Sequence, residues 1–260
     1  MNRLKDRKIP KLIGLVLSVI LWIEAGILTV FWSLLGLIMM PLSMILDRGT
    51  GHLLHGIAAL WARSMMVTNP VWQIKVEGLE SIQKGRHYVI VANHQSALDI
   101  LVLLSGLPLH FKFLAKQEIF PIPFIGWHMA LAGYIPLDRQ SHESGRKAIE
   151  TASHWLRKSV SVVFFPEGTR SLNGEISAFK MGAFKLAQDE NVEILPVVVE
   201  GTGDALPKKS WRLLKTTQFF LSIGKPVSLG TNRDSLESAK NSIRQEMVRC
   251  LASIRRVASD

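Results

Sequence analysis

The chain has 260 residues, of which 48% are hydrophobic, and its formal net charge at pH 7 is +10. This length suits one sizeable α/β domain with an appendage, and the positive charge favours anionic partners. The single cysteine, Cys250, excludes an intrachain disulfide. A mean hydropathy of +0.21 is high for a soluble protein and low for a polytopic one, so we expect a globular domain with one apolar anchor.

Residues 1–50 predict a membrane anchor of one or two apolar helices. Residues 1–11 are rich in Lys and Arg, whereas residues 12–46 are almost continuously apolar apart from Glu24. This run is too long for a signal peptide, and two full crossings would need about 40 apolar residues plus a turn. Three alternatives remain: a single span by residues 27–46, one strongly tilted helix, or two helices that enter and leave one leaflet.

We favour the two-helix alternative, with a break near residues 24–26. The basic N-terminus places that end of the chain in the cytoplasm, and a single full span would carry the rest of the chain to the opposite side. We expect the globular domain that follows the anchor to lie on the cytoplasmic side as well. Both ends of the anchor should therefore lie on the cytoplasmic side.

Residues 51–70 are expected to form a linker whose residues 53–68 are an amphipathic helix. His52 and His55 in this stretch are interpreted as partly exposed helix residues and not as metal ligands. From residue 71 to residue 260, short β-like runs alternate with helical stretches. Strands are expected at 71–76, 88–92, 111–114, 133–137, 160–165, 194–199 and 219–223. Helices are expected at 97–105, 142–157, 178–190 and 233–257. This alternation predicts an α/β domain with a mixed, largely parallel sheet flanked by helices.

The first candidate site is the segment from Asn93 to Asp99, which follows the expected strand at residues 88–92. His94 then lies at the carboxyl end of a strand, where α/β sheets hold their sites. Histidine can accept a proton near neutral pH, and a carboxylate five residues on can fold back to orient the ring. Such a pair would deprotonate an alcohol for attack on an acyl carbonyl. Alternatively, Ser96 and Asp99 form a capping box that only starts a helix.

The second candidate site is the segment FPEGTRS at residues 165–171, again directly after an expected strand. Gly168 permits unusual backbone dihedrals, and Arg170 offers a planar fork of donors that suits phosphate. The alternative is a tight turn in which Glu167 and Arg170 are simply solvated. Further basic residues at strand ends or helix starts are Lys116, Arg139 and Lys180.

Taken in order, the motifs NHQSALD, FLAKQEIFPIPFIG, GYIPLDR, FPEGTRS and ILPVVVEGT resemble those of the phospholipid-synthesis acyltransferases. The resemblance is greatest to the 1-acyl-sn-glycerol-3-phosphate acyltransferase branch and covers roughly residues 70–205. It implies that His94 is the general base and that Asp99 is its partner. One departure is Pro136, where the family usually has an apolar or aromatic residue.

The resemblance also assigns the remaining site residues. It implies a substrate phosphate bound by Lys116, Arg170 and Arg139. It implies a glycerol site shaped by Glu167, Gly168 and Thr169. The candidates for the acyl pocket are Phe124, Trp127 and Pro196, of which the first two lie in an apolar segment at residues 121–131 and the third lies in the fourth family block.

The expected reaction is direct acyl transfer to the sn-2 hydroxyl of 1-acylglycerol-3-phosphate, which gives phosphatidic acid. The donor would be acyl-CoA or acyl-acyl carrier protein, with no bound cofactor and no metal. No G-x-S-x-G elbow is present, so no covalent acyl-enzyme is expected. The expected partners are membrane lipids and the acyl donor, with no nucleic acid. The expected location is the bacterial inner membrane, with the catalytic domain facing the cytoplasm.

Three alternatives remain open at this stage. The same chemistry can act on another lysolipid, such as an amino-acid-linked lipid or a lysophospholipid with a headgroup. The same histidine can activate water in a lipid hydrolase. The chain can also be a basic protein that binds anionic lipid without catalysis.

Overall fold

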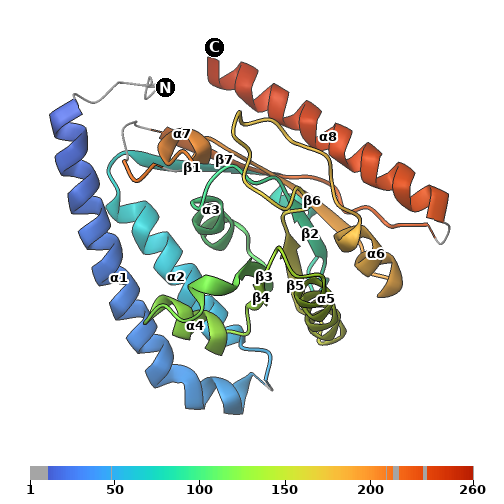
Figure 1. Cartoon of the computed structure of the whole chain (residues 1–260), viewed down its shortest axis with the longest axis horizontal. Coiled ribbons are helices and arrows are strands. Elements are labelled where there is room, and N and C mark those ends of the chain that lie inside the picture. Colours follow the sequence, from blue (N-terminus) through green and yellow to red (C-terminus); the bar gives the residue numbers. More distant parts are fainter. Residues whose placement is uncertain (1–10, 48, 209, 213–216, 231–232, 260) are drawn as a thin grey trace.

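The computed structural model describes residues 11–47, 49–208, 210–212, 217–230 and 233–259. A seven-stranded sheet with the order β1-β7-β6-β2-β5-β3-β4 lies at its centre (Figure 1). The strands are β1 (Trp72–Glu77), β2 (Val89–Ala92), β3 (Phe111–Lys116), β4 (Ile135–Leu137), β5 (Ser161–Phe164), β6 (Ile194–Glu200) and β7 (Thr217–Ile223). Neighbouring strands pair in parallel except β6 with β7. The predicted mixed, largely parallel sheet is therefore confirmed.

Helices cover both faces of this sheet. One face carries α2 (His52–Thr68) and α3 (Asp99–Gly106), and the other carries α5 (His142–Arg157), α6 (Gly182–Asp189) and α8 (Arg233–Ser259). Alternate strand residues serve the two cores: in β2, Ile90 and Ala92 pack under α2 and α3, whereas Val89 and Val91 pack under the other helices. The short helices are α4 (Ile125–Leu131), α7 (Thr202–Ala205), η1 (Leu79–Ser81) and η2 (Gln117–Ile119).

The N-terminal helix α1 (Lys11–Leu46) is continuous over 36 residues, so the predicted break near residues 24–26 is wrong. A single interior glycine costs only about 1 kcal/mol relative to alanine, which is too little to interrupt a long run of good helix formers. The hydroxyl of Thr29 also donates to the carbonyl of Ala25, one turn earlier, at 2.6 Å, so Ala25 at the expected break is bonded within the helix. The chain turns back only after residue 46, and α1 then lies alongside α2 and α4 (Figure 1).

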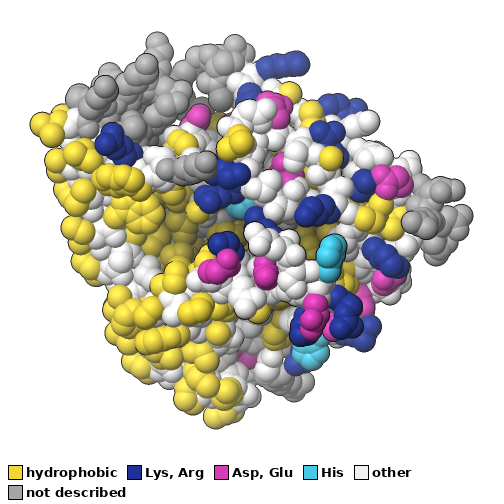
Figure 2. Space-filling view, in the orientation of Figure 1, with side chains coloured by type: hydrophobic (Ala, Val, Ile, Leu, Met, Phe, Trp, Pro, Cys, Tyr) yellow, Lys and Arg dark blue, Asp and Glu magenta, His cyan; other side chains and the backbone are white. Residues whose placement is uncertain are grey.

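Only one stripe of α1 is covered by the rest of the chain. Its buried positions recur at helical spacing and include Gly14, Ser18, Leu21, Ser33, Gly36 and Ser43. The other side exposes large apolar residues, among them Ile13, Ile20, Ile27, Phe31, Ile38 and Ile45. Within the described residues, α1 is the one helix long and apolar enough to cross a membrane, with a mean hydropathy of 2.3. Figure 2 shows the resulting apolar surface along this side of the molecule.

Candidate active site

The carboxyl ends of five parallel strands meet at one edge of the sheet and carry the polar residues that the motifs single out. His94 follows β2, Lys116 ends β3, Arg139 follows β4 and Arg170 follows β5. The fifth strand, β6, leads into Thr202 at the start of α7. The unusual Pro136 lies in β4, which is the edge strand of the sheet, where proline is tolerated because one side of the strand has no neighbour to bond.

His94 and Asp99 form a buried pair at this edge. The Nδ1 atom of His94 lies 2.7 Å from Oδ2 of Asp99. Because a carboxylate accepts hydrogen bonds, Nδ1 carries the hydrogen and Nε2 keeps its lone pair. Nε2 makes no hydrogen bond to the described part of the chain, and the His94 side chain lines a cavity. The ring is thus arranged to accept a proton from a molecule in that cavity.

Asp99 also fixes the loop that carries the histidine. Its Oδ2 atom accepts from the backbone N–H groups of Gln95 and Ser96 at 2.7 and 3.0 Å. Its Oδ1 atom accepts from the hydroxyl of Thr202. The helix-start interpretation and the catalytic interpretation of Asp99 are therefore compatible, because one carboxylate binds both the loop amides and the imidazole.

The FPEGTRS segment supports His94 from the neighbouring strand. The imidazole stacks on the ring of Phe165, with centroids 4.1 Å apart and planes inclined by 21°. Glu167 accepts from the backbone N–H of His94 at 2.9 Å through Oε1, and from the N–H and hydroxyl of Ser177 through Oε2. The N–H of Ser171 donates to the carbonyl of His94 at 2.8 Å. These contacts hold one face of the ring and fix the backbone of His94 through its N–H and its carbonyl.

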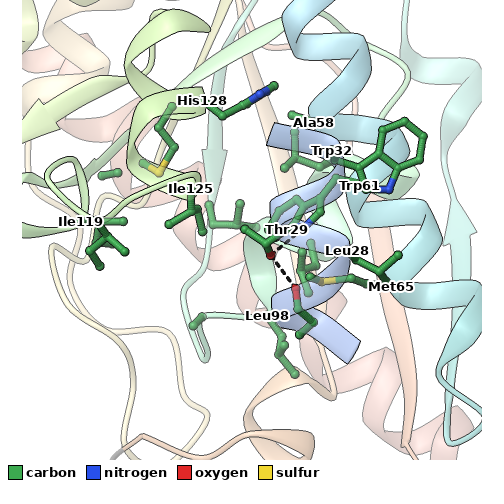
Figure 3. A pocket seen from close by; sticks show the side chains of 18 of the residues that line it. Leu28, Thr29, Trp32, Ala58, Trp61, Met65, Leu98, Ile119, Ile125 and His128 are labelled. Atoms are coloured by element: carbon green, nitrogen blue, oxygen red, sulfur yellow. Dashed lines mark hydrogen bonds between the residues drawn. The ribbon is translucent and has the colours of Figure 1, made fainter. Parts of the chain in front are cut away.

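An apolar cavity of about 720 Å³ extends from His94 between α1, α2 and the α4 region. Figure 3 shows its wall, where Leu28 and Trp32 of α1 and Trp61 of α2 lie opposite Ile119 and Ile125. The indole N–H of Trp61 donates to Thr29 at 3.1 Å and joins the two long helices along this wall. In Figure 2, a hollow lined by apolar side chains separates the α1 side from nearby basic residues. A hydrocarbon chain suits such a lining.

Basic side chains occupy the polar end of the same cavity, which is lined by Arg139, Arg170 and Lys116. Burial, and then the nearby charge of Arg170, lowers the pKa of Arg139. Neither guanidinium has a carboxylate partner among the described residues, whereas Lys116 pairs with the exposed Glu118 at 2.8 Å. Two guanidinium groups held close together without an acid favour the binding of an anion.

Several predicted site residues lie elsewhere. Trp127 is 45% exposed, and Pro196 lies within β6 beside Val91 of β2; neither lines this cavity, and their assignment to an acyl pocket stays a prediction. Phe124 does line the cavity. The local sequence does not show which face of the α4 region or of β6 a side chain occupies, so it could not separate Phe124 from Trp127 and Pro196.

The three residues predicted to shape the glycerol site also lie outside the lining of the cavity. The carboxylate of Glu167 is used entirely within the protein, as described above. Gly168 has a φ of 73°, and a Cβ atom there would lie 2.8 Å from Nζ of Lys180. The hydroxyl of Thr169 accepts from Lys208 at 3.3 Å. These residues form the turn that presents Arg170, and Lys180 supports that turn without lining the cavity.

Sequence reasoning missed the hydrogen bonds that join the loop carrying His94 to the end of β6 and the start of α7. Thr202 bonds Asp99, and Asn93 exchanges two hydrogen bonds with the backbone of Val199. Asn93 and Thr202 stand inside the motifs NHQSALD and ILPVVVEGT, but only their position in space identifies their partners. Within the described residues, no group of three or more His, Cys, Asp or Glu side chains is placed to hold a metal ion.

Comparison with known proteins agrees with this geometry. A model of the acyltransferase family matches residues 73–200. A 1-acyl-sn-glycerol-3-phosphate acyltransferase of Saccharomyces cerevisiae is 33% identical over 210 residues, which cover 79% of this chain and 69% of the yeast protein. The chain belongs to the acyltransferase family. The family motifs therefore correspond to the residues that surround the His94–Asp99 pair.

Other members extend the comparison to the whole fold. The chloroplastic 1-acyl-sn-glycerol-3-phosphate acyltransferase LPAT1 of Arabidopsis thaliana is 38% identical over 227 residues, or 86% of this chain. The chain spans about 60% of the length of the plant and algal relatives. The crystal structure of the 1-acyl-sn-glycerophosphate acyltransferase PlsC from Thermotoga maritima matches with a TM-score of 0.80 and 27% identity, over 94% of this chain and 97% of that one. The match includes the N-terminal helices as well as the sheet.

Proposed function

We propose that this protein transfers a fatty-acyl group from an acyl thioester to the sn-2 hydroxyl of 1-acylglycerol-3-phosphate and so forms phosphatidic acid. The observation that carries the proposal is the position of His94: its Nε2 makes no hydrogen bond to the described residues, and the residue lines a mainly apolar cavity that two arginines also line. The relatives named as 1-acyl-sn-glycerol-3-phosphate acyltransferases support the choice of acceptor.

In the proposed reaction, Nε2 of His94 removes the proton from the acceptor hydroxyl, and Asp99 stabilises the imidazolium that forms. The oxygen then attacks the carbonyl carbon of the thioester. The tetrahedral intermediate collapses, the C–S bond breaks, and the thiolate takes the proton back from His94. The ring of His94 is 8% exposed and stacked on Phe165, which limits the access of competing water.

The two ends of the cavity fit the two ends of the proposed acceptor. Arg139 and Arg170 bind its phosphate, with Lys116 at the exposed rim. The apolar part of the cavity, between α1, α2 and α4, binds the hydrocarbon chain. Its lining includes Leu28, Trp61 and Ile125. Acyl-CoA and acyl-acyl carrier protein both supply the required thioester, and either one fits the proposed mechanism.

We also propose that the protein rests in one leaflet, at the face of the membrane that meets the acyl donor. The helix α1 is about 54 Å long, which exceeds the roughly 30 Å hydrocarbon core, and it contacts the rest of the chain from Gly14 to Ser43. Large apolar side chains are exposed along α1 and also at Ile122 and Trp127 in the neighbouring α4 region. On this proposal α1 lies along the leaflet with its exposed apolar side toward the hydrocarbon, and both of its ends stay on the cytoplasmic side.

The activity is tested with the purified protein, labelled acyl-CoA or acyl-acyl carrier protein, and a panel of lysolipids, with products identified by mass. We expect phosphatidic acid and one free thiol for each acyl group transferred. Thiol release without a lysolipid would indicate a hydrolase, and transfer only to another lysolipid would redirect the assignment of the acceptor. Membrane binding without either reaction would indicate a non-enzymatic lipid-binding protein.

The orientation is tested by cysteine labelling in sealed vesicles of both orientations, in a Cys250→Ser background. Single cysteines are placed at Lys5 and at the exposed His52, which flank the apolar helix. We expect both to react from the same, cytoplasmic face. Reaction from opposite faces would contradict the one-leaflet arrangement and leave the chemistry of the site unaffected.

A further inference from the structure

The end of β6 is joined to the catalytic loop by three sets of hydrogen bonds. Asn93 donates to the carbonyl of Val199 at 2.9 Å and accepts from its N–H at 2.8 Å. Gln95 donates to Glu200 at 2.7 Å. Thr202 donates to Asp99. The fourth motif, ILPVVVEGT, therefore contacts the loop that carries His94, and its contact with Asp99 is made by a side-chain hydroxyl.

We propose that Thr202 is a positioning residue for the His94–Asp99 pair. The inference rests on the proposed function, because it assumes that this pair is the catalytic base. Three donors reach Oδ2 of Asp99, namely His94 and two backbone amides, whereas Thr202 is the side chain that bonds Oδ1. The torsion that rotates a carboxylate is broad and has no strong intrinsic minimum. A donor on Oδ1 sets this rotation and keeps Oδ2 directed at the imidazole.

The local backbone directs the Thr202 hydroxyl toward Asp99. Gly201 has a φ of 90°, and a Cβ atom there would lie 2.5 Å from the carbonyl oxygen of Gln218, so the turn requires glycine. Thr202 follows directly as the first residue of α7, and its side chain is fully buried. A β-branched side chain has few χ1 rotamers, so the hydroxyl is held in place without Asp99 having to order it.

A purely structural role for Thr202 predicts a different outcome from a positioning role. If the hydroxyl only satisfied a buried carboxylate, its removal would lower thermal stability and leave the turnover of the remaining folded protein unchanged. If it positions Asp99, its removal lowers kcat of folded protein. Because Thr202 does not line the cavity, KM for both substrates should stay the same in either case.

The experiment compares Thr202→Val, which keeps the shape and removes the hydroxyl, with Thr202→Ser, which keeps the hydroxyl. We expect Thr202→Val to lower kcat by about 10- to 100-fold, the range for a hydrogen bond to a charged group, with both KM values unchanged. Thr202→Ser should restore kcat to within a few-fold of the unmodified protein. The control is Thr151→Val on α5, where the hydroxyl bonds only the Lys147 carbonyl, and it should leave kcat unchanged.

A second comparison keeps the proposal testable if Thr202→Val does not fold. Thr202→Ala and Thr202→Ser differ by the hydroxyl alone, and the same difference in kcat is expected between them. In an Asp99→Asn background, removing the hydroxyl should change kcat little, because the two side chains act as one unit. Equal kcat for the Ser variant and the Val or Ala variant would overturn the role of Thr202. Absence of acyl transfer by the unmodified protein would instead overturn the proposed function.

Discussion

Histidines lie at opposite ends of the sheet and have opposite surroundings. At the carboxyl end, His94 bonds a carboxylate and opens onto a cavity. At the amino end of β3, His55 and His110 lie beside Lys112, whose ammonium is fully buried. The prediction that His55 is a partly exposed helix residue is wrong, because it packs on Phe111 and bonds Leu109.

The amino-end group is arranged as a structural joint. Nζ of Lys112 donates to the carbonyls of Thr50 and Ala132 at 2.7 and 2.6 Å, and to Nε2 of His110 at 3.1 Å. These bonds tie β3 to the turn between α1 and α2 and to the end of α4. Burial, assisted by the charge of Lys112, lowers the pKa of His55 to about 3 and that of His110 to about 2.

The difference in surroundings is the reason why we propose His94 as the base, and not His55 or His110. Burial without a carboxylate keeps an imidazole neutral and leaves it only hydrogen-bonding and packing roles. A carboxylate at Nδ1 stabilises the protonated ring, and an open Nε2 gives a substrate access to it. On this view the residues at the carboxyl edge carry out the proposed catalysis. Lys112 at the amino edge holds the turn between α1 and α2 and the end of α4, the helices that surround the cavity.

Removal of the catalytic imidazole should have the largest effect. His94→Ala should lower kcat by about 10²- to 10⁴-fold, because the acceptor hydroxyl loses its general base. His55→Gln, which changes the amino-end group, should leave kcat of the folded protein nearly unchanged. Steady-state rates of both variants at matched folded concentration measure the contrast, and a similar loss of kcat in the two would remove the distinction between the two groups.

Removal of the arginines should affect the acceptor more than the donor. A hydrogen bond to a charged group contributes roughly 1.5–3 kcal/mol, so Arg170→Ala and Arg139→Ala should each raise KM for the phosphorylated lysolipid about tenfold or more. KM for the thioester should change little. Arg170→Lys should recover only part of the loss, because an ammonium lacks the planar fork. An equal rise in both KM values would argue against a phosphate site here.

The length of the bound hydrocarbon chain should respond to a side chain added inside the cavity. Gly26 lines the cavity, and a Cβ atom there meets no other atom within 4 Å. Gly26→Leu should therefore shift preference toward shorter chains, by about fourfold for each methylene that no longer fits, since one buried CH₂ contributes about 0.8 kcal/mol. Gly56→Leu is the control, because Gly56 is equally uncrowded but lies outside the lining. The same preference in both variants would place the hydrocarbon elsewhere.

The amino-end group should make stability depend on pH. The pKa values of His55 and His110 are lower in the folded state than the ordinary value of 6.5, so the unfolded state binds protons first as the pH falls. The free energy of unfolding should fall between pH 6.5 and pH 3, by roughly 2 kcal/mol per histidine at pH 5. His110→Gln should weaken this dependence, as measured by thermal midpoints from pH 5 to pH 7. An unchanged pH dependence in that variant would mean that other groups dominate acid sensitivity.

Local sequence patterns predicted the strands, the helices α3, α5, α6 and α8, and the edge that carries His94, Lys116, Arg139 and Arg170, but not the short helices α4 and α7. These features follow from apolar runs that end in polar residues, and from the rule that parallel strands end at the same edge. The cavity could not be predicted, because it forms between the consecutive helices α1 and α2 and the α4 region, which lies much further along the chain. The inward direction of Glu167 also depends on its partner Ser177, which lies on a loop outside the motif.

The most direct test of the central claim is the turnover of Asp99→Asn, measured together with its thermal midpoint. An asparagine can direct its oxygen toward His94, Gln95 and Ser96, while its amide group donates to the Thr202 hydroxyl, so the hydrogen bonds of the loop can be kept and the charge alone is lost. We predict that kcat falls by about 10²-fold or more while the stability changes by about 1 kcal/mol or less. Near-normal kcat in this variant would contradict the account, because Asp99 would then serve only the start of α3.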